Sequence, residues 1–214
     1  MLTPDQTSAQ TLELCRMAPV IPVLVVDDVA TARPLAEALV AGGLPVLEVT
    51  LRTPAALDAI AEMAAVPGGI VGAGTVLNAL DVATAKAAGA RFAVSPGATE
   101  ALLTACSEQD LPLLPGAATA TEAMSLLEKD YTTAKFFPAA AAGGAQALKA
   151  IGAPLPQITF CPTGGIGPGT ARDYLALSNV ACVGGSWVAP ARLVAAGDWA
   201  GIEALARVAA AMAG

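Results

Sequence analysis

One lysine stands inside an apolar run of the sequence. Residues 133–138 read TAKFFP, and Lys135 is the only charged residue between Asp130 and Lys149. An ammonium group among aromatic and aliphatic neighbours is poorly solvated, which disfavours its charged form. A neutral lysine amine is a nucleophile toward carbonyl groups. The run therefore predicts a nucleophilic lysine; the alternative is a structural lysine that extends to water or pairs with Glu48.

The other three lysines have ordinary contexts. Lys86, Lys129 and Lys149 all fall in helical or helix-end sequence, where a solvated side chain is the default. Lys135 alone occupies a strand position, so it is the candidate for chemistry.

A second group of polar residues alternates along a predicted strand. Val46, Glu48, Thr50 and Arg52 share one face by the two-residue period of a strand, and the residues between them are apolar. Polar side chains that point into a barrel near the C-terminal end of a strand are typical of an active site. The alternative is that Glu48 and Arg52 form a structural ion pair that plugs the barrel.

Two glycine-rich loops could bind an anion. They are CPTGGIGPG at 161–169 and VGGSW at 183–187, with Thr163 and Ser186 offering hydroxyl groups beside the glycines. Backbone N–H groups in such loops, helped by a following short helix, form a phosphate cradle in many barrels. One Gly-Gly pair alone is more often a tight turn. Two pairs after the last two strands indicate a phosphate site.

Two further strand ends carry small residues, GAGT at 72–75 and SPG at 95–97. Each is consistent with simple strand-to-helix punctuation. Small residues there would also let a substrate lie against the backbone, and Thr75 adds a hydroxyl group.

Eight short β-branched runs alternate with alanine-rich segments, which favours βαβ units and a parallel sheet. The runs are VIPVLVV (20–26), VLEVTL (46–51), IVGAGTV (70–76), RFAVSP (91–96), LPLLPG (111–116), TAKFFP (133–138), QITFCPTGG (157–165) and VACVGGSW (180–187). Their number and spacing predict an α/β fold, a (β/α)8 TIM barrel forming a single domain over residues 1–214. An open doubly wound sheet would bring a G-x-G-x-x-G after its first strand, where this chain has DDVATARP.

Helices should flank and cover this barrel. We expect an extra N-terminal helix near residues 4–16 and a final helix over 199–212. Asp27 or Asp28 is expected to cap the helix that runs to Gly42. Thr99 and Thr119 (or Thr121) are further expected helix starts.

The composition limits the possible partners. Hydrophobic residues make up 55% of the 214 residues, charged residues 14%, and the formal net charge is -7. Nucleic acid and anionic membranes are poor partners for such a chain. The scarcity of polar surface predicts that partner subunits cover part of the molecule.

The sequence has no histidine, so hydrolase triads and zinc sites are disfavoured and no metal is expected. The four cysteines show no C-x-x-C spacing. We interpret all four as small buried hydrophobic residues in a reducing cytosol.

Six motifs, taken in order, strongly resemble the bacterial 2-keto-3-deoxy-6-phosphogluconate (KDPG) aldolases, also described as 4-hydroxy-2-oxoglutarate (KHG) aldolases. The motifs are LEVTLRT (47–53), VGAGTVL (71–77), AVSPGATE (93–100), KFFPA (135–139), CPTGGI (161–166) and GGSW (184–187). The likeness runs from about Ala18 to the end of the chain.

This resemblance implies a class I, metal-independent Schiff-base aldolase of the Entner-Doudoroff pathway, usually a cytoplasmic homotrimer with no cofactor. It would cleave KDPG, a keto-deoxy sugar acid phosphate, to pyruvate and glyceraldehyde 3-phosphate, and would also act on KHG. By motif match, Lys135 resembles the Schiff-base lysine and Glu48 the general acid/base. The implied substrate-binding residues are Arg52 and Thr75 for the carboxylate, Gly164, Gly165 and Ser186 for the phosphate, and Pro96, Phe137 and Thr163 for the pocket wall.

Other activities share these features. The nearest is an aldolase for the 6-phosphogalactonate epimer or for unphosphorylated KHG alone. A phosphosugar isomerase or epimerase would share the phosphate loops and would need an acid/base pair but no covalent lysine. The third alternative is a non-catalytic, phosphosugar-binding barrel that serves as an assembly subunit. The segment AAAGG at 140–144 is less polar than the family pattern, which could alter the pocket rim.

Overall fold

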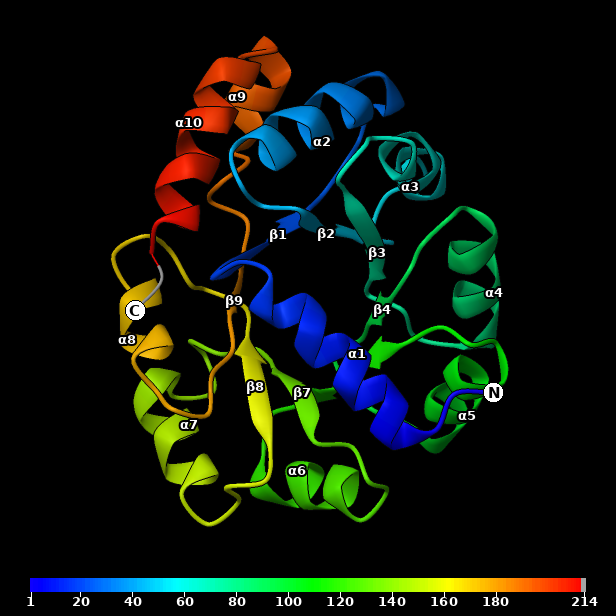
Figure 1. Ribbon diagram of the computed structural model, residues 1–214, viewed down its shortest axis with the longest axis vertical. Coiled ribbons are helices and arrows are strands. Elements are labelled where there is room, and N and C mark those ends of the chain that lie inside the picture. The colour runs from blue at the N-terminus through cyan, green and yellow to red at the C-terminus, as the bar shows by residue number, and fades with distance from the viewer. Residues whose placement is uncertain (213–214) are drawn as a thin grey trace.

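Parallel strands curl into a ring whose outer side is covered by helices, an α/β barrel-like fold (Figure 1). The computed structural model describes residues 1–212. The strands are β1 (Val20–Leu24), β2 (Val46–Thr50), β3 (Ile70–Gly74), β4 (Ala93–Val94), β5 (Leu113–Leu114), β6 (Gly116–Ala117), β7 (Thr133–Phe136), β8 (Thr159–Pro162) and β9 (Val183–Gly185). The helices are α1 (Pro4–Arg16), the 3-10 turn η1 (Val29–Thr31), α2 (Ala32–Ala41), α3 (Ala56–Ala64), α4 (Ala79–Ala87), α5 (Glu100–Glu108), α6 (Ala120–Leu127), α7 (Gly144–Gly152), α8 (Ala171–Leu175), α9 (Ala191–Ala196) and α10 (Trp199–Ala210).

The strands form two parallel sheets that lie edge to edge. One has the order β5-β4-β3-β2-β1-β9, and the other has the order β6-β7-β8. Isolated parallel bridges join Phe160 to Val180 and Thr163 to Gly184, which brings β8 alongside β9. On the other side, only Pro115 separates β5 from β6.

Every predicted run contains a strand, but the strands are shorter than expected. The run at 111–116 is divided into β5 and β6 on either side of Pro115. Proline has no N–H group for the strand ladder, so pairing is interrupted there. The Pro115 carbonyl still accepts a hydrogen bond from the Lys135 N–H at 2.8 Å.

Side-chain caps start several helices where the sequence predicts them. Thr99 caps α5, and Thr119 forms a capping box with Glu122 at the start of α6. Asp28 accepts from the Ala30 N–H and caps the 3-10 turn η1, so the expectation that it caps the long helix directly was wrong. The short turn comes between the cap and α2.

The barrel-like fold has two distinct cores. Side chains such as Leu47, Val49 and Phe136 point outward and pack with the helices, whereas Val46 and Phe92 belong to a separate cluster inside the ring. This separation follows from the two-residue alternation along each strand.

Helix α1 lies across the opening of the ring (Figure 1). Its Ser8 accepts hydrogen bonds from the Thr132 N–H at 3.0 Å and from the Thr133 hydroxyl at 3.1 Å. Because Thr133 begins β7, α1 closes the N-terminal end of the strands. The chemistry expected at the strand C-termini therefore lies at the opposite end.

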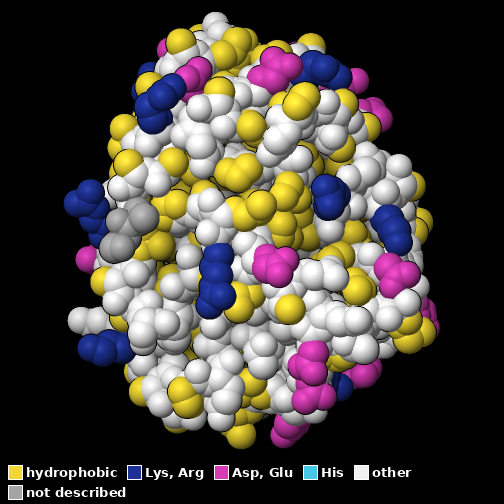
Figure 2. Space-filling view, in the orientation of Figure 1, with side chains coloured by type: hydrophobic (Ala, Val, Ile, Leu, Met, Phe, Trp, Pro, Cys, Tyr) yellow, Lys and Arg dark blue, Asp and Glu magenta, His cyan; other side chains and the backbone are white. Residues whose placement is uncertain are grey.

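Charged side chains of both signs are interspersed over the face on which α1 lies (Figure 2). None of the helices described within residues 1–212 combines the length and hydrophobicity that crossing a membrane requires.

Candidate active site

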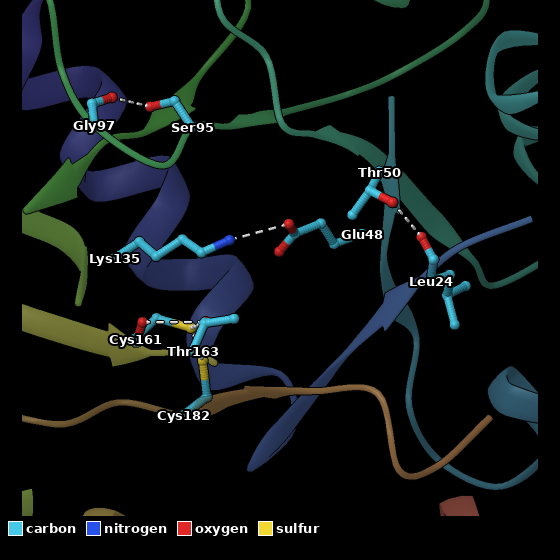
Figure 3. Close-up of polar contacts among 9 residues, drawn as sticks. All are labelled: Leu24, Glu48, Thr50, Ser95, Gly97, Lys135, Cys161, Thr163 and Cys182. Atoms are coloured by element: carbon cyan, nitrogen blue, oxygen red, sulfur yellow. Dashed lines mark hydrogen bonds and ion pairs between the residues drawn. The ribbon is translucent and has the colours of Figure 1, made fainter. Parts of the chain in front are cut away.

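Lys135 and Glu48 point toward each other across the lumen (Figure 3). The Lys135 Nζ lies 3.1 Å from the Glu48 Oε1, and the side chains are only 7% and 4% exposed. Nζ also lies 5.2 Å from the centroid of the Phe137 ring. The pairing foreseen as an alternative for Lys135 is thus confirmed, and it compensates two charges that would be costly to bury alone. The distance also allows direct proton transfer between the two groups.

The strands fix this pair in place. Glu48 lies at the centre of β2, in register with Val23 of β1 and Gly72 of β3. Gly74 leaves the space that the Glu48 carboxylate fills, since a Cβ at Gly74 would overlap it. Two residues further along β2, the Thr50 hydroxyl donates to the Leu24 carbonyl at 2.8 Å and ties β2 to β1.

The pair lies in a cavity of about 390 Å³ at the C-terminal ends of the strands, a volume in the usual range for small-molecule sites. All ten residues predicted from the sequence line it: Glu48, Arg52, Thr75, Pro96, Lys135, Phe137, Thr163, Gly164, Gly165 and Ser186. The structure therefore gathers the whole predicted set in one place.

Arg52 lies at the exposed rim of the cavity. Within residues 1–212, the ion-pair partner of Glu48 is Lys135 and not Arg52, so the alternative of a structural Glu48–Arg52 plug was wrong. A guanidinium group at the rim remains free to bind a carboxylate with two parallel hydrogen bonds.

The first glycine loop has the backbone of an anion cradle. Gly164 and Gly165 have φ values of 102° and 71°, which side-chain-bearing residues rarely adopt. Across residues 1–212, neither their N–H groups nor that of Ser186 donates a hydrogen bond to another residue. Backbone donors without a partner, in residues that line a cavity, suit a phosphate group.

Thr75 has a strained backbone at the edge of the cavity. Its φ is 61°, unusual for a β-branched residue, and it follows directly after β3. Such strain persists where the surrounding structure enforces it and is common at functional sites. It directs Thr75 into the cavity wall.

The sequence reasoning missed five lining residues: Val23, Thr50, Ile166, Gly184 and Gly185. Thr50 was placed on the lumen face but not in the site, and both glycines belong to the quoted VGGSW loop. Val23 can be assigned to the cavity only because it pairs with Glu48, and this pairing is known only once the register of β1 and β2 is known.

A barrel-like α/β fold with a buried lysine and carboxylate at the C-terminal end of its strands fits a class I aldolase. The family model described as KDPG and KHG aldolase matches residues 12–205. The 2-dehydro-3-deoxy-phosphogluconate aldolase of Pseudoalteromonas atlantica is 56% identical over 194 residues, 90% of each chain. The chain belongs to the KDPG and KHG aldolase family, which confirms the resemblance seen in its motifs.

Solved structures of relatives agree with this assignment. The KDPG aldolase of Zymomonas mobilis with 3-phosphoglycerate is 52% identical, with a TM-score of 0.89 and 94% of each chain covered. The KDPG aldolase of Legionella pneumophila, with pyruvate captured as a covalent carbinolamine, is 48% identical with a TM-score of 0.90. That match covers 93% of this chain and 97% of the relative.

Proposed function

We propose that this protein cleaves KDPG to pyruvate and glyceraldehyde 3-phosphate through a Schiff base on Lys135, and that it also acts on KHG. The single observation that carries the proposal is the buried Lys135–Glu48 pair, 3.1 Å apart, in a member of an aldolase family. A buried amine beside a proton acceptor is the arrangement that imine formation requires.

Glu48 first makes Lys135 a nucleophile. When the substrate enters, the Glu48 carboxylate takes a proton from the Lys135 ammonium, and the free amine attacks the C2 ketone. Glu48 then gives this proton to the carbinolamine oxygen, takes a second proton from the carbinolamine nitrogen and passes it to the same oxygen, so that water leaves and an iminium forms. The covalent pyruvate carbinolamine in the Legionella relative supports this order of events.

The iminium then acts as an electron sink. The Glu48 carboxylate takes the C4 hydroxyl proton, directly or through one water, and the C3–C4 electron pair moves toward the iminium as glyceraldehyde 3-phosphate leaves. Glu48 returns the proton to C3 of the enamine. Hydrolysis of the new iminium releases pyruvate and restores the amine.

The remaining cavity residues bind the two ends of the substrate. Arg52 and Thr75 hold the carboxylate, and Gly164, Gly165 and Ser186 hold the phosphate. Pro96, Phe137 and Thr163 line the pocket between them. The free N–H groups of the glycine loop and the position of Arg52 at the rim support this orientation of the substrate.

The assembly is proposed on similar grounds. The isolated bridges between β8 and β9 support a closed (β/α)8 barrel forming one domain over residues 1–214. The 55% hydrophobic content supports a homotrimer. The four reduced cysteines fit a cytoplasmic location.

Pyruvate release from a substrate panel tests the function. KDPG should be the best substrate, ahead of the 6-phosphogalactonate epimer and KHG, and inorganic phosphate should compete with the phosphorylated substrates. Lys135→Arg keeps a cation beside Glu48 but cannot form the imine, so it should abolish pyruvate release. Substrate conversion without pyruvate release that persists in Lys135→Arg would instead indicate an isomerase or epimerase, and ligand binding without any conversion would indicate a binding protein.

A further inference from the structure

Three buried thiols meet inside the barrel, below the Lys135–Glu48 pair. They are Cys15 of α1, Cys161 of β8 and Cys182, which comes just before β9. Their sulfur atoms all lie within 4.8 Å of one another, and the Cys182 Sγ donates to the Cys161 Sγ at 3.5 Å (Figure 3). None of the three residues is more than 2% exposed.

We propose that Cys15, Cys161 and Cys182 form a binding site for a soft monovalent metal ion, copper(I), whose occupation inhibits the enzyme. Binding replaces thiol protons with the metal and moves no electrons. The metal site lies outside the catalytic cavity and its occupation does not depend on the substrate assigned above, whereas the inhibition rests on the Lys135 mechanism proposed there.

The sulfur positions suit a metal ion. A metal–thiolate bond is about 2.3 Å long, so an ion shared equally by three sulfurs holds them about 3.8 to 4.0 Å apart. The observed positions, with one pair at 3.5 Å and the others within 4.8 Å, bracket this separation.

The surroundings select a soft ion of low coordination number. Ile21, Phe92, Val94 and Leu114 belong to the same buried cluster, and they offer no ligand atom. Within residues 1–212, no fourth cysteine or carboxylate joins the group, and the whole sequence lacks histidine. Zinc strongly prefers four ligands, whereas thiolates favour copper(I), which is stable with three.

Helix α1 provides an entry route. Cys15 lies one residue before the end of α1, whose Ser8 anchors it to the start of β7. A helix that caps the barrel from outside the strand ladder can open locally without breaking the sheet. Its movement would separate Cys15 from the other two thiols.

Occupation would reach the active site through β8. Cys161 is the register partner of Lys135 on the neighbouring strand, and its Sγ lies 3.9 Å from the Thr163 hydroxyl oxygen in the cavity wall. A copper–thiolate cluster carries net negative charge, which stabilises the ammonium form of Lys135 and opposes imine formation. Copper(I) should thus lower aldolase activity.

Anaerobic titration of the full chain with copper(I), buffered by a competing chelator, tests the site. The wild type should bind one ion per chain, and X-ray absorption should show three sulfurs at about 2.3 Å. Cys15→Ala should weaken binding by more than about 100-fold and remove copper inhibition, with uninhibited activity unchanged. Cys106→Ala is the matched control, because Cys106 is also buried but lies in the outer core.

Cys182→Ala is a second variant and should lose binding in the same way as Cys15→Ala. Circular dichroism establishes that each variant is folded before it is titrated. The proposal is overturned if the wild type binds no copper, if Cys15→Ala and Cys106→Ala bind it equally, or if zinc binds the wild type as tightly.

Discussion

The two ends of the lumen are built from the same strands but differ in chemistry. At the N-terminal end, Val46 and Phe92 pack in a buried cluster beneath α1, whereas Glu48 and Lys135 face the cavity at the C-terminal end. On β2, the side chains that face the lumen change from apolar to ionisable within two residues, from Val46 to Glu48. Residues for packing and residues for catalysis therefore follow one another along the same face of a strand. Mutations at the two ends should separate stability from activity.

Glu48→Gln should have the largest effect on catalysis, and it also lowers stability because it leaves Lys135 buried without its partner. The amide cannot take or return a proton, so kcat should fall by about 10²- to 10⁴-fold while the protein stays folded. Steady-state kinetics with KDPG and a thermal melt measure the two quantities. Glu62→Gln is the control, because Glu62 pairs with Arg33 on the surface. A Glu48→Gln variant with near-normal kcat would refute the acid/base role.

Phe92→Ala tests the opposite end. Phe92 is among the largest fully buried side chains, so its loss should lower the free energy of unfolding by about 3 to 5 kcal/mol. Urea denaturation gives this value, and kcat per folded molecule should remain near that of the wild type. If kcat dropped as far as stability did, the two ends would not be separable.

Arg52→Lys should give a smaller effect at the cavity rim. A lysine offers no bidentate pair of donors to the substrate carboxylate, so kcat/KM should fall by about 10- to 100-fold. Kinetics with KDPG and with KHG should show similar losses, because both carry the carboxylate. Arg33→Lys, on the outer surface, should change neither. A loss confined to one substrate would contradict the assignment of Arg52.

The smallest effect should come from outside the lumen, at the start of α6. Hydrogen bonds from the backbone of Ala118 and from Thr119 lower the pKa of Glu122. Because the folded pKa is the lower one, this stability is present above the unfolded pKa of about 4.3 and is lost as pH falls through the folded pKa.

Glu122→Gln should therefore be destabilised by about 1 kcal/mol at pH 7, and the difference from the wild type should shrink below about pH 4. Urea denaturation at several pH values measures this, and kcat should not change. A difference that stayed constant with pH would show that the carboxylate charge plays no part in the cap.

The sequence alone was sufficient for the strands that carry chemistry. The two-residue alternation placed Glu48 and Lys135 on the lumen face, and both line the cavity. Glycine pairs located the anion loops because the left-handed backbone at Gly164 and Gly165 nearly requires that residue.

The rest depended on contacts between distant segments. The ion pair between Lys135 and Glu48 was only one of several alternatives for Lys135. The two residues are 87 positions apart in the sequence, so only the fold brings them together. The missing N–H group of Pro115 divides the strand, but the different partners of the two halves, β4 for β5 and β7 for β6, depended on the fold. The prediction that Cys15, Cys161 and Cys182 are buried was confirmed. Their spacing in the sequence did not indicate that their sulfur atoms lie close together.

Trapping with borohydride tests the central claim most directly. The protein is incubated with pyruvate, reduced, digested and mapped by peptide mass spectrometry. The account predicts one pyruvate-derived adduct, on Lys135, and none in the Lys135→Arg variant. An absent adduct, or one spread over Lys86, Lys129 and Lys149, would contradict a Schiff base at this site.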